Sequence, residues 1–174
     1  MGMSVIISVA AEDDAEQILK LQYLGYQGEA ELYGDWGIEP LTQTLDSLRA
    51  ELAERHVLVA RLGDEVVGTV RGRVDESGVG RIGRLVVHPR MQRHGLGGRL
   101  LDAMERLLLE DGPVEAFRLF TGHRHLGNLR LYTRQGYLRT GAEPVGGQSA
   151  GRHPTGERPG RVVLEKPVRS ALAA

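Results

Sequence analysis

The residues most capable of chemistry in this 174-residue chain are concentrated between Arg81 and Arg99. This window contains five arginines, two histidines and no acidic residue, and its last part holds Gly95, Gly97 and Gly98. Glycine permits positive φ angles and close backbone approach. The amide groups at the start of a following helix also favour an anion. The pattern therefore predicts an anion-binding loop suited to a diphosphate.

Two familiar phosphate-binding loops can be compared with this segment. A P-loop requires Gly-Lys-Ser/Thr, which is missing from the chain. A dinucleotide-binding fingerprint requires a third glycine at its usual spacing and a βαβ unit that opens the chain, and Gly95-Leu-Gly97 satisfies neither condition. A glycine turn that opens a helix can also be purely structural, so the loop alone does not identify its ligand.

A second segment with chemical potential contains Asn128 and Tyr132. Their i,i+4 spacing places both side chains on one face of a helix. Gly136 is expected to end that helix, and Tyr137 to enter the next strand. Taken alone, Tyr132 is equally well explained as a half-buried core tyrosine.

Together, the two segments resemble the GNAT superfamily of N-acetyltransferases. Residues 87–101, Val-His-Pro-Arg-Met-Gln-Arg-His-Gly-Leu-Gly-Gly-Arg-Leu-Leu, match the family's acyl-CoA motif at nearly every position. Residues 128–137 match its Asn-x-x-x-Tyr-x-x-x-Gly-Phe/Tyr element. The resemblance is strong over about residues 56–141, and the order of the expected elements extends it over the whole domain.

The resemblance implies transfer of an acetyl or other acyl group from acyl-CoA to a primary amine, by direct attack in a ternary complex. Backbone N–H groups near Leu85 and Val86 would polarise the thioester carbonyl. Tyr132 would be the general acid for the departing thiolate, and Asn128 would contact the cofactor or orient a water molecule. The implied cofactor-binding residues are Leu85, Val86, Val87, Gln92, Arg93, His94, Gly95, Leu96, Gly97, Gly98, Arg99, Asn128 and Tyr132.

The general base is where the sequence departs from the family pattern. Many relatives place a glutamate at the position that Arg81 occupies here. Direct carboxylate catalysis from that position is therefore in doubt. The alternatives are a chain of water molecules or one of several side chains, namely Glu31, Asp35, Glu76, His123 and His125.

The charge distribution bears on the acceptor. Residues 1–60 contain 11 acidic and 3 basic residues, whereas residues 61–174 contain 12 acidic and 19 basic residues. An acidic N-terminal third predicts a cationic amine acceptor, and a basic remainder predicts an anionic partner such as the phosphates of coenzyme A. The family builds its acceptor wall near Tyr26, Glu29, Glu31, Tyr33, Asp35 and Trp36. The candidate substrate-binding residues are Glu31, Tyr33, Asp35 and Glu76.

The elements that must position these residues follow from hydrophobic periodicity and turn signals. We expect strands at residues 4–10, 56–62, 65–75, 82–88, 114–121, 137–141 and 161–167, and helices at about 13–24, 40–55, 96–111 and 126–135. Residues 25–37 are expected to be irregular, residues 146–160 to form a polar loop, and residues 170–174 to be a frayed tail. This order predicts an α/β (α+β) three-layer domain with a mixed, mostly antiparallel sheet of about seven strands and about four flanking helices.

The length of 174 residues suits one domain over residues 1–174. Within it we expect acceptor-side elements at about 11–55, an acyl-CoA-binding core at about 56–141, and C-terminal strands at about 137–167. The absence of cysteine excludes disulfides, thiolate nucleophiles and Cys-ligated zinc. His123-x-His125 is a weak metal signal, so no metal is predicted. Without a basic leader or a membrane-length apolar stretch, the chain is expected to be cytoplasmic, with no membrane partner.

Two functions of other classes stay open. A domain that binds acyl-CoA as a sensor without turnover is compatible with the departure at Arg81, although Tyr132 argues against it. A nucleic-acid-binding module is disfavoured because the arginines are scattered and aromatic residues make up only 5% of the chain. No nucleic-acid partner is therefore expected, and the resemblance leaves homodimerisation open.

Overall fold

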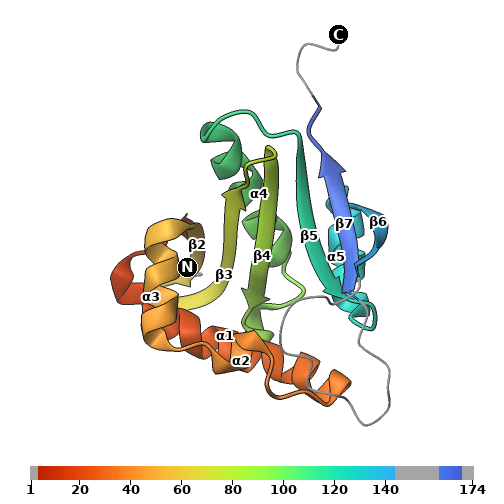
Figure 1. Ribbon diagram of the computed structural model, residues 1–174. Helices are drawn as coiled ribbons and strands as arrows, with labels where there is room; N and C mark the ends of the chain where they lie inside the picture. The colour runs from red at the N-terminus through yellow and green to blue at the C-terminus, as the bar shows by residue number, and fades with distance from the viewer. Residues whose placement is uncertain (1–3, 144–160, 170–174) are drawn as a thin grey trace.

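A computed structural model describes residues 4–143 and 161–169 of the chain (Figure 1). Its strands are β1 (Val5–Val9), β2 (His56–Leu62), β3 (Glu65–Val74), β4 (Val79–Val87), β5 (Ala116–Gly122), β6 (Leu138–Glu143) and β7 (Arg161–Pro167). Its helices are α1 (Ala15–Tyr33), α2 (Glu39–Thr42), α3 (Leu45–Glu54), α4 (Leu96–Glu110) and α5 (Leu126–Arg134), with short 3-10 turns at η1 (Glu12–Asp14) and η2 (Pro89–Met91). The polar loop and the C-terminal tail expected from the sequence lie outside the described residues.

The strands form one seven-stranded sheet in the order β1-β2-β3-β4-β5-β7-β6. Every neighbouring pair is antiparallel except β4 and β5, which are parallel. This confirms the predicted mixed, mostly antiparallel α/β sheet. The described residues contain five α-helices where about four were predicted, because the helix expected at 40–55 is divided. Thr44 is extended and its side chain accepts a hydrogen bond from the Ser47 N–H, so a new helix begins there.

The two faces of the sheet carry separate cores. The apolar stripe of α4 (Leu100, Leu101, Met104 and Leu108) is fully buried, in one cluster with Tyr132 of α5. On the other face, Ile18 and Leu21 of α1 and Leu48 of α3 pack with four valines of β2, β3 and β4. The sheet therefore lies between α4 and α5 on one side and α1 to α3 on the other, as a three-layer domain requires.

Helix α1 is longer than the sequence suggested. Residues 25–37 were expected to be irregular, but the helix continues to Tyr33 and ends at Gly34, whose φ is +63°. The prediction was wrong because the helix is extended by a contact with the sheet that the local sequence does not show. A Cβ at Gly25 would lie 2.3 Å from Cγ1 of Val86 on β4, so this glycine allows the helix to approach the sheet.

Strands β4 and β5 separate along their length. They pair only between Val79–Arg81 and Ala116–Arg118, and beyond those residues they diverge (Figure 1). The remaining part of β4 carries a β-bulge: Thr69 pairs with Val86 and Arg71 pairs with Gly83, so Arg84 and Leu85 both lie opposite one residue of β3. The result is a gap between β4 and β5, and along it the edge of β4 has no neighbouring strand from the part of the chain that the structure describes.

Helix α1 passes the open end of this gap. Near its middle, α1 approaches Val86 of β4 at Gly25. At its C-terminal end, Tyr33 lies against Gly122, the last residue of β5. Figure 1 shows α1 and α2 across the end of the sheet towards which β4 and β5 point. Among the described residues, no helix is both long and apolar enough to cross a membrane.

Candidate functional site

The edge of β4 that faces the gap presents backbone amides. The His88 N–H donates to the Val67 carbonyl on β3 at 2.8 Å. Because directions alternate along an antiparallel strand, the Val86 N–H also points to β3, whereas those of Leu85 and Val87 point into the gap. The family resemblance implied Leu85 and Val86 as donors. The strand pairing therefore directs the amides of Leu85 and Val87 into the gap. The Val86 amide, which the resemblance implied, is directed to β3 instead.

The loop after β4 reverses the chain into α4. Gln92 Nε2 donates to the Val87 carbonyl at 3.2 Å, which ties the loop to the strand end. Arg93 and Gly95 both have left-handed backbones, with φ of 69° and 75°. Gly95 is the N-cap of the 15-residue helix α4, whose first amides have no intrahelical acceptor. Amides of the loop and of the first turn of α4 are therefore candidate donors to an anion.

The other glycines of this segment allow two helices to approach each other. A Cβ at Gly97 would lie 3.0 Å from Leu131 Cδ2, and one at Gly98 would lie 2.5 Å from Gln135 Nε2. Leu131 lies on α5 and Gln135 is its C-cap, so α5 packs against the first turn of α4. The glycines therefore fix the distance between the anion-binding loop and the helix that carries Tyr132.

Tyr132 and Asn128 lie on α5 as the spacing predicted. Tyr132 is only 6% exposed and packs edge-on against Tyr137, with ring centroids 6.2 Å apart. Burial raises the pKa of the Tyr132 hydroxyl, and the nearby Tyr26 and Glu29 raise it further. The Asn128 side-chain amide donates to Thr121 Oγ1 at 3.3 Å, which fastens α5 to the end of β5.

The side of the site formed by α1 carries Tyr26, Glu29 and Tyr33. Burial raises the pKa of the Tyr26 hydroxyl to about 12. Burial also raises the pKa of the Glu29 carboxyl above its ordinary value. The charges of His125, Arg161 and Arg84 lower the pKa of Glu29 in turn. Glu29 on α1 therefore lies near charged groups from the turn before α5, from β7 and from β4. A carboxylate of raised pKa is a better proton acceptor than an ordinary one.

The candidate acceptor residues fall into two regions. The Tyr33 hydroxyl accepts from the Arg124 N–H at 3.0 Å, and Asp35 accepts from the Gly37 N–H at 3.0 Å, so both lie at the α1 end of the gap with the exposed Glu31. Glu76 is exposed in the turn between β3 and β4, at the opposite end of the sheet (Figure 1). The structure thus separates Glu76 from the other three candidates.

Three further residues discussed from the sequence have side chains bonded to protein partners. Arg81 Nε donates to Asp75 Oδ2 at 2.7 Å, at the closed end of the gap. Arg99 turns away from the loop and its Nη2 donates to the Val5 carbonyl at 3.2 Å. His125 Nδ1 accepts from the Asn128 N–H at 3.3 Å, which in the neutral ring places the proton on Nε2.

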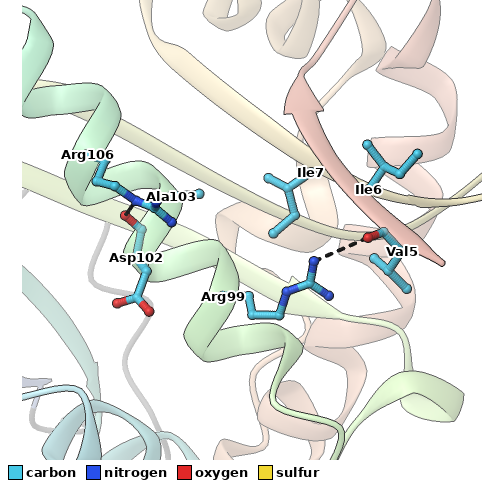
Figure 2. Close-up of a pocket in the computed structure, with 7 residues that line it drawn as sticks. All are labelled: Val5, Ile6, Ile7, Arg99, Asp102, Ala103 and Arg106. Carbon is cyan, nitrogen blue, oxygen red and sulfur yellow. Dashed lines mark hydrogen bonds between the residues drawn. The ribbon is translucent and has the colours of Figure 1, made fainter.

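Arg99 also borders a cavity of about 460 Å³ that is separate from the β4–β5 gap (Figure 2). It lies between β1 and α4 and is lined by Val5, Ile6, Ile7, Arg99, Asp102, Ala103 and Arg106. Figure 2 shows that its two arginines bond to protein carbonyls, Arg99 to Val5 and Arg106 to Asp102. No group of three potential metal ligands occurs among residues 4–143 and 161–169.

Arg84 is a residue that the sequence did not single out. In the sequence it is only one of five arginines between Arg81 and Arg99. Glu29 was likewise only one of the residues near the expected acceptor wall and was not a candidate substrate-binding residue. The structure places Arg84 at the bulge, with φ of 52°, beside Tyr26 and Glu39. No local signal marks this position, because the bulge arises from the register between β3 and β4.

Comparisons with known proteins agree with this geometry. The family model described as "Acetyltransferase (GNAT) family" matches residues 16–137. S-(2-succino)cysteine N-acetyltransferase of Bacillus subtilis (strain 168) is 28% identical over 147 residues, covering 79% of this chain and 87% of that protein.

Solved structures share the fold at low identity. PaiA N-acetyltransferase from Thermoplasma acidophilum, in complex with coenzyme A, has a TM-score of 0.74 and 16% identity, with 95% of this chain and all of that chain covered. The yncA structure from Salmonella typhimurium, with its cofactor acetyl-CoA, has a TM-score of 0.74 and 18% identity, with 98% of each chain covered.

Proposed function

The chain belongs to the acetyltransferase (GNAT) family, and from this premise we propose that it transfers the acetyl group of acetyl-CoA to a primary amine by direct attack in a ternary complex. The observation that carries the proposal is the opening between β4 and β5. The amides of Leu85 and Val87 line its β4 edge, and the nearby helix α5 carries Tyr132. Direct attack requires no protein nucleophile, which agrees with a chain that contains no cysteine.

The residues present fit the cosubstrate. The free edge of β4 offers amide partners to an extended pantetheine arm, and the loop from Gln92 to Gly98 offers converging amides to a diphosphate. Arg93 adds a positive charge to this loop, whereas the Arg99 guanidinium is bonded to Val5 and its contribution is limited to the backbone. Acetyl-CoA supplies an activated thioester, with an electrophilic carbonyl carbon and a thiolate leaving group.

The chain's own groups then have separate roles. The Leu85 N–H holds the developing negative charge on the carbonyl oxygen, an interaction worth about 2.7–4 kcal/mol in a well-aligned site. Tyr132 donates its proton to the leaving sulfur, because a phenol whose pKa is raised by burial stays protonated at neutral pH. Asn128, fastened to Thr121, keeps α5 in place relative to β5.

The amine must lose a proton before it can attack. Of the carboxylates around the open end of the gap, Glu29 is the one whose pKa burial raises. We therefore assign to Glu29 the binding of the cationic ammonium group and the acceptance of its proton, directly or through water. This assignment keeps the predicted acidic acceptor side and moves its centre from Glu31, Tyr33 and Asp35 to Glu29. Homodimerisation stays a prediction from the family resemblance.

The test is release of coenzyme A thiol from acetyl-CoA with a panel of amines. We expect wild-type turnover with at least one amine and a loss of about 10²–10⁴-fold in kcat for Tyr132→Phe, the usual contribution of a general acid. Tyr23→Phe, an exposed tyrosine on α1, is the matched control and should retain activity. Binding of coenzyme A without turnover in the wild type would instead identify a sensor domain.

A further inference from the structure

Arg84 has an unsatisfied guanidinium inside the protein. Its side chain is 18% exposed, and Nη2 lies 3.3 Å from Oε1 of Glu39 on α2. Its Nη1 is buried and has no hydrogen-bond partner among residues 4–143 and 161–169. A buried charged donor without an acceptor is costly, so Nη1 requires an acceptor that the described residues do not supply. Arg84 is therefore a candidate ligand-binding residue independent of the anion-binding loop.

The backbone directs Arg84 to the acceptor side of the site. Its φ of 52° is unusual for a residue other than glycine, and it belongs to the bulge that interrupts the β3–β4 ladder. The guanidinium carbon lies 5.9 Å from the ring centroid of Tyr26 on α1. Arg84 thus reaches towards α1 and α2, on the sheet face opposite the α4 core.

A second arginine lies beside Arg84. Arg71 on β3 is 3% exposed, is ion-paired to Glu51, and has a buried Nε without a partner. Burial lowers the pKa of the Arg71 guanidinium, and the charge of Arg84 lowers it further, so the two cations are close. The partner of Arg84, Glu39, is 72% exposed and well hydrated. Neither ion pair supplies a hydrogen-bond acceptor to the buried Nη1 of Arg84.

We propose that Arg84 binds a carboxylate of the acceptor through its free Nη1, so that the acceptor is an amino acid rather than a simple amine. An N–H of a charged guanidinium donates a strong hydrogen bond to a carboxylate, and here Nη1 can donate it while Nη2 stays with Glu39. Arg84 immediately precedes Leu85, so its backbone lies at the proposed reacting centre, and its guanidinium reaches from there to Tyr26 on α1. Glu29, across from Arg84 on α1, receives the ammonium group of the same molecule.

This inference rests on the proposed function and narrows it. The sequence predicted a cationic acceptor from the acidic first third of the chain. The structure keeps a cationic amino group but adds a site for a negative charge in the same small molecule. A polyamine would bring a second positive charge beside Arg84 and Arg71, which opposes its binding.

The experiment compares L-amino acids with their α-carboxamides in the thiol-release assay. The probes are alanine, methionine, phenylalanine and glutamate, each with its matching amide, together with spermidine. We expect the wild type to prefer at least one free acid by about 10- to 100-fold in kcat/KM, as a hydrogen-bonded charge pair provides. Arg84→Gln should remove this preference mainly through KM for the amine, and Arg84→Lys should restore part of it.

Arg81→Gln is the matched control, because it removes an arginine of the same strand that is paired with Asp75 away from the site. It should leave both KM values unchanged, and all variants should keep the wild-type KM for acetyl-CoA. If Arg84→Gln does not fold, the wild-type comparison of acids with amides still decides. Amides or spermidine that react as well as the free acids would overturn the carboxylate site while leaving the N-acetyltransferase function intact. Absence of thiol release with every amine would overturn the function itself.

Discussion

The contact between α1 and β4 can be tested with two glycines on the same helix. Gly25 faces Val86, and a Cβ there would lie 2.3 Å from Cγ1 of that buried, β-branched side chain. Gly28, three residues further along α1, has no atom within 4 Å of its Cβ position. Alanine at either position should gain about 1 kcal/mol of helix propensity. The difference between the two variants therefore isolates the packing at Val86.

We expect Gly28→Ala to stabilise the protein by about 0.5–1 kcal/mol, which corresponds to a rise in Tm of roughly 1–4 °C for a domain of this size. Gly25→Ala gains the same propensity but carries an overpacking cost of about 1–3 kcal/mol. Its free energy of unfolding should accordingly be about 1–3 kcal/mol below that of Gly28→Ala. Because α1 also carries Tyr26 and Glu29, Gly25→Ala should raise KM for the amine and leave KM for acetyl-CoA unchanged.

Urea and thermal unfolding followed by circular dichroism measure both variants. The double variant Gly25→Ala/Val86→Ala removes the clashing methyl groups, so the two substitutions should be less destabilising together than the sum of their separate effects. Equal stabilisation by Gly25→Ala and Gly28→Ala would refute the reasoning, because it would mean that α1 does not press on β4 at Val86.

Two further predictions concern residues outside the reacting centre. Burial of Asp14 acts to raise the pKa of its carboxyl, but hydrogen bonds from Arg61 and from the Ala11 N–H together outweigh this desolvation, so the pKa is lowered. The ionised Asp14 carboxylate should contribute fully to stability above the ordinary pKa of about 4, and this contribution should be lost as pH falls through the lower folded-state pKa. Asp14→Asn should therefore flatten the dependence of unfolding free energy on pH in that acid range. An unchanged dependence on pH in the variant would contradict this. Arg99→Gln removes a guanidinium bonded to the Val5 carbonyl and should lower stability by about 0.5–1.5 kcal/mol while leaving KM for acetyl-CoA within about threefold. Arg93→Gln, in the loop itself, is the comparison, and a larger rise in KM for Arg99→Gln than for Arg93→Gln would show that Arg99 swings to the diphosphate.

Much of the fold was predictable because its signals are local. The strands at His56–Leu62 and Arg161–Pro167 have the predicted bounds, since β-prone runs ended by turn residues define them. Helix α4 begins at Leu96 as expected, because its apolar stripe has a clear helical period. The family resemblance also rests on short, contiguous segments, which is why residues 87–101 and 128–137 are sufficient to indicate the family from the sequence alone.

Other properties depend on contacts between distant segments, and the tertiary structure alone decided them. Gly25 looks like a helix breaker in the sequence, but the approach of α1 to Val86 makes it part of a longer helix. The register between β3 and β4 decides which amides of β4 face the gap. The bulge in the same pairing decides the orientation of Arg84. Glu76 and Glu29 are both plausible carboxylates by residue type, and only the path of the chain places them at opposite ends of the sheet. Residue types and local spacing thus determined the family and the glycine-containing loop that opens α4, whereas long-range register and packing determined which charged groups lie around the open end of the gap.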